Sequence, residues 1–194
     1  MYKHSARQGP SFAKTTHMKK LQLYIATSLD GYVARPDGSL DWLTQFPNPD
    51  QLDYGYPEFY AGIDTVVMGR KTYEEILGFD VPWPYADCTS YVVSSNADLP
   101  LKTEDTKLLG GNFAEALKEE KTKDGKNIWL VGGGGLVKAC MEHELVDELI
   151  WTIIPVVLGE GIPLFPKGVK ETSFKLTKAE GLSTGAVMLW YARA

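Results

Sequence analysis

Four consecutive glycines at positions 132–135 follow an apolar run, "IWLV", and precede a segment with helical periodicity. Glycines at a strand-to-helix turn let backbone N–H groups approach an anion closely, and the helix start adds about half a positive charge. The pattern therefore favours a diphosphate. It is not a Rossmann fingerprint, because Val137 stands where the last glycine belongs, and no Gly-Lys-Ser/Thr follows to make a P-loop. The alternative is a tight turn packed against a neighbouring strand.

A second strand-to-helix junction carries two cations. The apolar run "VVMG" ends at Gly69, Arg70 and Lys71 follow, and Thr72 begins a helix-like segment. An arginine holds a phosphate through two hydrogen bonds, and a neighbouring lysine adds a point charge. The hydroxyl of Thr72 is a further phosphate donor. The alternative is a solvated helix start with a chance dibasic pair.

A third apolar run, "YVV", ends in Ser94 and Ser95. These serines either cap the following segment or line a ligand cleft. In open α/β sheets, ligands bind outside the carboxyl ends of the strands. Because all three segments stand at such ends, we expect them to converge on one extended ligand that carries phosphates.

The order of the predicted elements supports this convergence. Strands that alternate with helices imply right-handed crossovers and parallel pairing, and the last two strands form an antiparallel pair. The predicted fold is α/β: a three-layer α-β-α, doubly wound, mostly parallel sheet with antiparallel C-terminal strands. We expect strands at 21–27, 64–69, 90–95, 127–131, 147–159, 172–182 and 186–193, helices at 71–77, 112–125 and 136–145, a loop at 28–43, and a weak helix at 49–63 broken by Gly55 and Pro57.

Length and charge limit the possible functions. The 194 residues suit one domain, which we place at 18–194, with residues 1–17 as a disordered extension or tag. A net charge of −5 argues against a general nucleic-acid or membrane-surface binder, because such proteins need a basic face. No run is long enough to span a membrane.

The cysteines and histidines point to a metal-free cytoplasmic protein. Cys88 and Cys140 show no CxxC spacing, and a chain of this length needs no disulfide framework, so we expect reduced thiols. The three histidines are scattered without metal-ligand spacing.

In this order, the motifs resemble the dihydrofolate reductase superfamily. The similarity is greater to the branch that includes the C-terminal reductase domain of bifunctional riboflavin-biosynthesis deaminase-reductases. The matching segments are "YIATSLDGYVA", "VVMGRKTYE", "YVVSSN", "IWLVGGGGLV" and "VDELIWTIIPVVLGEGIPLF", and the resemblance extends from Met18 to Ala194. The chain departs from these relatives in carrying no deaminase zinc signature and no dense basic cluster for a ribose phosphate.

The resemblance implies an NADPH-dependent reductase. Two cations beside the adenosine end suit a 2′-phosphate, whereas a carboxylate there would suit the free hydroxyl of NADH. The implied cofactor residues are Gly69, Arg70, Lys71 and Thr72 for the adenosine-side phosphates, Ser94 and Ser95 for the adenine ribose, Gly132, Gly133, Gly134, Gly135, Leu136 and Val137 for the diphosphate, and Ala26 for the nicotinamide.

The substrate end rests on fewer signals. Counted back from Gly69, Asp53 lies near the place of the acidic residue that anchors a pterin in dihydrofolate reductases, and Asp30 follows the first strand in "SLDG"; both are our catalytic candidates. A surface acid and a turn cap are the respective alternatives. Trp42, Trp83 and Tyr85 form either a stacking wall for a flat ring or part of the core.

The resemblance therefore predicts hydride transfer from C4 of NADPH to a C=N or C=O bond of a pterin- or ribosylamino-pyrimidine-like heterocycle. The protein's part is mainly to hold the two reactants in contact. The alternative is a non-catalytic nucleotide-binding or scavenging protein with the same cleft. We also expect a homodimer, because the run "LIWTIIPVVL" is longer than one core layer needs.

Overall fold

The computed structural model describes residues 18–79 and 81–194, so the prediction for residues 1–17 lies outside it. Within the described residues, no helix has the length and apolar character needed to cross a membrane. The strands are β1 (Leu21–Ser28), β2 (Tyr32–Ala34), β3 (Ile63–Gly69), β4 (Thr89–Val93), β5 (Thr106–Leu109), β6 (Asn127–Gly132), β7 (Val146–Ile154), β8 (Ile162–Pro163), β9 (Phe174–Gly181) and β10 (Val187–Arg193). The helices are α1 (Asp41–Thr44), α2 (Tyr56–Ala61), α3 (Arg70–Leu77), α4 (Phe113–Lys121) and α5 (Gly134–Glu142).

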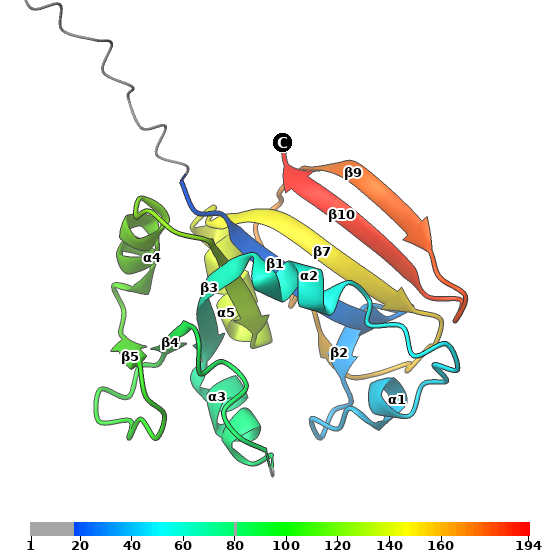
Figure 1. Ribbon diagram of the computed structural model, residues 1–194, viewed down its shortest axis with the longest axis horizontal. Helices are drawn as coiled ribbons and strands as arrows, with labels where there is room; N and C mark the ends of the chain where they lie inside the picture. Colours follow the sequence, from blue (N-terminus) through cyan, green and yellow to red (C-terminus); the bar gives the residue numbers. More distant parts are fainter. Residues whose placement is uncertain (1–17, 80) are drawn as a thin grey trace, which may run out of the picture.

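In the part of the chain that is described, eight strands form one sheet in the order β5-β4-β3-β6-β1-β7-β10-β9 (Figure 1). Neighbours from β5 to β7 run parallel, whereas β10 pairs antiparallel with β7 and β9 antiparallel with β10. The predicted α/β fold, mostly parallel with antiparallel C-terminal strands, is confirmed. β7 ends at Ile154 rather than at the predicted residue 159, because Pro155 cannot donate to the ladder.

The centre of the sheet is buried on both faces. Val66 and Met68 of β3 pack in one core cluster with residues of α2 and α3, whereas Val67 packs in the other with residues of α4 and α5. Alternate residues of a strand point to opposite faces, so a strand covered on both sides is apolar throughout. This explains why "TVVMG" reads as a continuous apolar run rather than an alternating one.

The C-terminal end of the sheet differs from its centre. The β9–β10 hairpin lies at the end of the sheet opposite α3 and α4 (Figure 1). Seven of the eight residues of β9 are exposed. Helical layers therefore flank the parallel strands, and the antiparallel hairpin extends past them.

Part of the region predicted as a loop is regular structure. Residues 28–43 contain β2 and α1, and β2 pairs with β8 in a small second sheet. Neither β8 nor β5 was predicted from the sequence. A strand of two to four residues acquires its partner through the tertiary fold, and a local pattern of that length carries little signal.

The predictions for two helices were wrong in detail. Gly55 has a φ of 71° and precedes the first residue of α2, and Pro57 lies in its first turn, so these residues begin the helix rather than break it. α4 ends at Lys121 instead of running to Gly125. The hydroxyl of Thr122 donates to the carbonyl of Glu119 at 2.7 Å, which closes the last turn.

Candidate functional site

A cleft of about 1150 Å³ lies at the carboxyl ends of β4, β3, β6 and β1. These four strands are neighbours in the sheet, so segments far apart in the sequence meet at one edge. The cleft is lined by most of the residues predicted to bind phosphates and ribose: Gly69, Arg70, Lys71, Thr72, Ser94, Ser95, Gly132, Gly133, Gly134, Gly135 and Leu136.

The two phosphate motifs touch each other. Gly133 has a φ of 95°, and a Cβ placed on it would lie 3.3 Å from Oγ1 of Thr72 and 3.7 Å from Cα of Gly69. A side chain at Gly133 would therefore separate the two turns and would also strain the backbone. The absence of a side chain there is what brings the second turn against the first.

Two helix N-termini consequently lie side by side. α3 has eight residues and α5 has nine, and within the described residues neither begins with a side-chain cap. A Cβ on Gly135 would meet no atom within 4 Å, so the first turn of α5 is open to the cleft. Free N–H groups and the positive ends of two helix dipoles make this corner of the cleft a site for an anion.

Gly134 has a different role from Gly135. A Cβ on Gly134 would lie 3.3 Å from the carbonyl oxygen of Pro163, in the wall formed by β8. Gly134 therefore allows that wall to pack closely on the start of α5. Of these two glycines, Gly135 is the one that leaves room for a ligand.

The cations stand at the start of α3. Nη1 of Arg70 lies 2.7 Å from a carboxylate oxygen of Glu74, one turn further along the helix, and about two fifths of each side chain is exposed. Such a pair on a helix surface is weak, so a phosphate can compete with Glu74 for the guanidinium. Lys71 is exposed and lines the same cleft.

Ser94 combines both of the predicted roles, capping and lining. Oγ of Ser94 accepts a hydrogen bond from the N–H of Asn96 at 3.0 Å, which is the capping role. Both Ser94 and Ser95 also line the cleft, next to the end of β4. Capping and lining are compatible because a hydroxyl oxygen keeps a donor proton for a ligand.

The model of the RibD C-terminal domain family matches residues 19–188. The chain belongs to the RibD C-terminal domain family. The predicted resemblance to the reductase branch of the dihydrofolate reductase superfamily is thus confirmed.

Two relatives resemble this RibD C-terminal domain along nearly its whole length. It is 43% identical over 178 residues to Uncharacterized protein YwjB of Bacillus subtilis (strain 168), which covers 91% of this chain and 99% of the relative. It is 34% identical to a putative riboflavin biosynthesis protein from Shewanella sp. PV-4, a crystal structure with a TM-score of 0.80 that covers 90% of this chain and 99% of that one.

A more distant structure shows how widely the fold is shared. Dihydrofolate reductase from Enterococcus faecalis, solved in complex with NADP(H), is 19% identical with a TM-score of 0.61. The match covers 90% of this chain and 96% of that one. At this identity the likeness establishes the fold alone, and this RibD C-terminal domain has the fold of that reductase.

Two predicted cofactor residues do not line the cleft of this RibD C-terminal domain. Val137 is 2% exposed and packs in the core cluster beneath α5. Ala26 lies in β1 opposite Thr152 of β7, and its neighbour Ile25 lines the cleft instead. A backbone contact from Ala26 stays a prediction.

Asp30 holds two loops together at the end of β1. Its carboxylate accepts the hydroxyl of Ser28 at 2.7 Å and the N–H groups of Leu158 and Gly159 at 3.1 and 2.7 Å. These hydrogen bonds lower the pKa of Asp30, and the bond from Ser28 has the largest effect. A carboxyl group kept ionised is a poor proton donor, and Asp30 does not line the cleft. Its catalytic role stays a prediction.

Asp53 is exposed and lies just before α2. Its carboxylate accepts the N–H of Gly55 at 2.8 Å, which helps the chain to turn into the helix. It does not line the cleft either. Its predicted catalytic role is likewise untested by this placement.

The three aromatic residues predicted as a stacking wall lie in the interior. Trp42 is 6% exposed and packs with Ile154 in a small core cluster. Trp83 and Tyr85 meet edge to face with ring centres 5.2 Å apart, and Tyr85 contacts Trp129 in the same way at 5.4 Å. None of the three lines the cleft, so the geometry favours the alternative, a core role.

Other residues supply the apolar surface of the cleft. They come from β1, β2, the end of α3 and the segment around β8, and β2 and β8 meet through the pair Ala34 and Ile162. The sequence offered one signal for this wall, the motif "GEGIPLF" of the family resemblance, but no local pattern linked it to β2. These residues are Ile25, Val33, Ala34, Pro36, Leu40, Ile76, Phe79, Ile162, Pro163 and Pro166.

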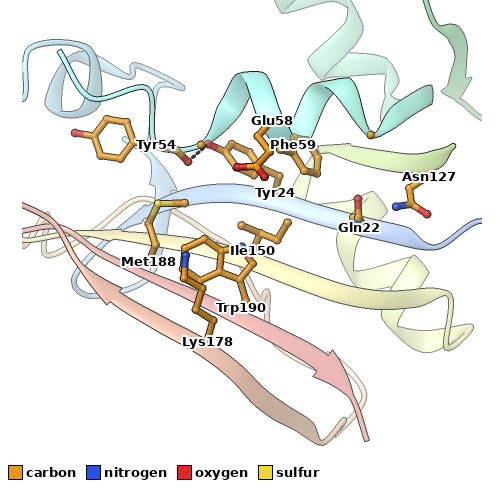
Figure 2. A pocket seen from close by; sticks show the side chains of 12 residues that line it. Gln22, Tyr24, Tyr54, Glu58, Phe59, Asn127, Ile150, Lys178, Met188 and Trp190 are labelled. Carbon is orange, nitrogen blue, oxygen red and sulfur yellow. Dashed lines mark hydrogen bonds between the residues drawn. The ribbon is translucent and has the colours of Figure 1, made fainter.

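A second cavity of about 350 Å³ lies between α2 and the strands β1, β7, β9 and β10, and Figure 2 shows its side chains. Tyr24 and Phe59 stack with ring centres 4.4 Å apart, and Nζ of Lys178 lies 4.2 Å from the ring centre of Trp190. The hydroxyl of Tyr24 donates to the carbonyl of Tyr54 at 2.9 Å (Figure 2). We call this cavity the aromatic groove, and none of the predicted site residues lines it.

Proposed function

We propose that this protein is an NADPH-dependent reductase that transfers a hydride to a C=N or C=O bond of a flat pterin- or ribosylamino-pyrimidine-like heterocycle. One observation carries the proposal. Two helix N-termini without side-chain caps meet through Gly133 in a single cleft, and two cations stand beside them. An elongated ligand with phosphates in its middle and at one end fits this arrangement.

The residues present fit the cofactor. The open position at Gly135 leaves space for a diphosphate against the first turn of α5. Arg70 and Lys71 would hold the 2′-phosphate, and the two serines at the end of β4 would face the adenine ribose. The apolar surface around Ile25 would receive the nicotinamide, with Ala26 next to it in the backbone.

The bound cofactor would supply the hydride, and the chain's own residues would position the acceptor ring and exclude water from it. The apolar walls contributed by α3 and by β2 and β8 are suited to a flat ring. Among the described residues, the carboxyl groups that line the cleft are Asp37 and Glu75. We assign proton delivery to one of these two or to water, and keep Asp30 and Asp53 as candidates to be tested by substitution.

A titration followed by a turnover assay tests the proposal. NADPH should quench protein fluorescence or shift its own emission on binding, and it should be consumed in the presence of a suitable pterin or ribosylamino-pyrimidine. Failure of NADPH to bind would overturn the proposal. The control is the same titration with the variant Gly135→Val, whose side chain would occupy the proposed diphosphate site.

A non-catalytic nucleotide-binding protein is the second candidate, because neither predicted acid lies in the cleft. Cofactor that binds but is never consumed across a panel of heterocycles would favour it.

The proposal includes a homodimer in the cytoplasm. The exposed strand β9 offers an uncovered surface, with Leu176 49% exposed. Cys88 and Cys140, the two cysteines of the chain, are buried and unpaired, which suits a reducing compartment. Light scattering of the purified protein tests the dimer.

A further inference from the structure

The charges that line the cleft are few. Among the described residues, the lining cations are Arg70 and Lys71, and the lining acids are Asp37 and Glu75. Arg70 already pairs with Glu74 at 2.7 Å. The cleft therefore has no excess of positive charge, although it is proposed to hold a ligand with several phosphates.

The two acids stand on opposite walls. Glu75 lies on α3, one helical turn beyond Lys71, on the same side as the apolar residues Ile76 and Phe79. Asp37 lies in the loop after β2, and its carboxylate accepts the N–H of Ser39 at 2.9 Å. The walls away from the glycine turn thus combine apolar surface with one carboxylate each.

The proposed cofactor uses all the positive charge that is available. A 2′-phosphate on Arg70 and Lys71 and a diphosphate on the two helix N-termini leave no lining cation, in the described residues, for a phosphate on a second ligand. Arg35, near the end of β2, does not line the cleft, and Asp41 holds it through two hydrogen bonds of 2.6 and 3.1 Å. A phosphorylated substrate would meet two carboxylates and the anions of the cofactor, which repel it.

We infer that the substrate of this reductase carries no phosphate: it is an uncharged, flat heterocycle whose amino or hydroxyl groups donate to Asp37 and Glu75. The inference rests on the proposed function, because the cofactor's phosphates are what occupy the cations. An amino group on the ring gains a charge-assisted hydrogen bond from either carboxylate. A phosphate in the same place would be left without a counter-ion.

Matched pairs of compounds test the inference on the NADPH-loaded protein. One pair is 5-amino-6-(ribosylamino)uracil with and without its 5′-phosphate, and the other is dihydroneopterin with and without a side-chain phosphate. Calorimetric titration should show that the unphosphorylated member of at least one pair binds about tenfold more tightly or better. The preference should shrink as salt is raised, because Asp37 is exposed and its field is screened.

Variants locate the effect. Asp37→Asn keeps an acceptor for the N–H of Ser39 but removes the negative charge, so the preference for the unphosphorylated compound should fall several-fold. Asp37→Lys should abolish or invert that preference. Glu171→Lys makes a comparable change at an exposed position outside the cleft and should leave the preference unchanged. Thermal unfolding confirms that each variant is folded.

The outcomes distinguish a failure of the proposed function from a failure of the inference about the substrate. Loss of NADPH binding in the loading step would overturn the proposed function itself. A loaded protein that binds the phosphorylated members equally or better, or binds none of the four compounds, would overturn the inference and leave the cofactor assignment standing.

Discussion

The cleft at the sheet edge and the aromatic groove are built from different materials. The cleft is made largely of backbone, glycine and short hydroxyl side chains at the ends of adjacent parallel strands. The groove is made largely of long side chains from α2 and from five strands, including Trp190 and Lys178 of the C-terminal hairpin. The cleft exposes helix N-termini, whereas the groove exposes aromatic rings and the aliphatic parts of long side chains.

This difference indicates that the cleft is suited to anions, whereas the aromatic groove is a gap in the packing between α2 and the sheet. Helix N-termini attract phosphates irrespective of side-chain detail. Two polar groups of the groove have partners in the protein: Tyr24 donates to the carbonyl of Tyr54, and Lys178 lies over Trp190 and 2.7 Å from Glu180. Burial also raises the pKa of Tyr24 to about 12, so its hydroxyl stays protonated. Under the proposed function, the cleft binds the cofactor, and we expect the contacts of the groove to contribute to stability.

The largest effect should come from closing the open turn of α5. Gly135→Val places a side chain where a Cβ meets no protein atom, so the fold tolerates it while the diphosphate loses its N–H contacts. Loss of two charge-assisted hydrogen bonds, each worth about 1.5–3 kcal/mol, should weaken NADPH and NADH alike by at least about 100-fold. Fluorescence titration measures both affinities.

Gly181→Val is the matched control for that change. A Cβ on Gly181 also meets no atom within 4 Å, but this residue ends β9, far from the cleft in the sheet order. It should leave both affinities unchanged. Equal losses in the two variants would mean that the turn of α5 has no special part in binding.

The next effect should discriminate between the two cofactors. Arg70→Ala should weaken NADPH by about 1.5–3 kcal/mol and NADH by much less, because NADPH alone presents the 2′-phosphate. Glu74→Gln releases Arg70 from its ion pair and should strengthen NADPH by a few tenths of a kcal/mol. The ratio of the two dissociation constants is the measurement.

Lys178→Ala removes a cation of the aromatic groove and is the control for Arg70→Ala. Neither dissociation constant should change. If both cofactors lose affinity equally in Arg70→Ala, the 2′-phosphate does not sit on Arg70.

The fold was predictable wherever a local pattern decides the outcome. The apolar run indicated a strand at 64–69, and β3 confirms it. β2 and β8 were not predictable, because Tyr32 and Pro163 form a pair only after the β1 and β7 ends have been brought together. Their wall supplies much of the apolar surface of the cleft, so the substrate end escaped prediction for the same reason.

The cofactor end was more predictable because backbone conformation is encoded locally. Glycines at 132–135 specify an open turn whatever surrounds them, and Gly69 ends a strand before a helix. The role of an acid or an aromatic ring depends on where tertiary packing points it. Asp30 and Trp83 are of the right residue types for a site, yet one braces two loops and the other packs against Tyr73.

A smaller effect, on stability, should appear in the groove. Trp190→Ala removes a half-buried ring and its contact with Lys178, and should cost about 2 kcal/mol of unfolding free energy, which corresponds to about 4–8 °C in Tm. NADPH affinity should not change. A variant with unaltered Tm and weakened NADPH would reverse the roles assigned to the two cavities.

The smallest effect should be a pH dependence of stability that originates at Asp30, beyond the end of β1. The hydroxyl of Ser28 and two backbone N–H groups lower the folded-state pKa of Asp30, so its ionised form is stabilised by folding. That contribution is complete above the unfolded-state pKa of about 4 and is lost as pH falls through the lower folded-state value. Asp30→Asn should therefore have a slightly lower Tm than the wild type at pH 7, and the two should converge below pH of about 4. Asp53→Asn, which retains an acceptor for Gly55, is the matched control and should leave the Tm at pH 7 unchanged. A loss of turnover in Asp30→Asn with unchanged Tm and unchanged NADPH affinity would instead give Asp30 the catalytic role and contradict its assignment as a brace.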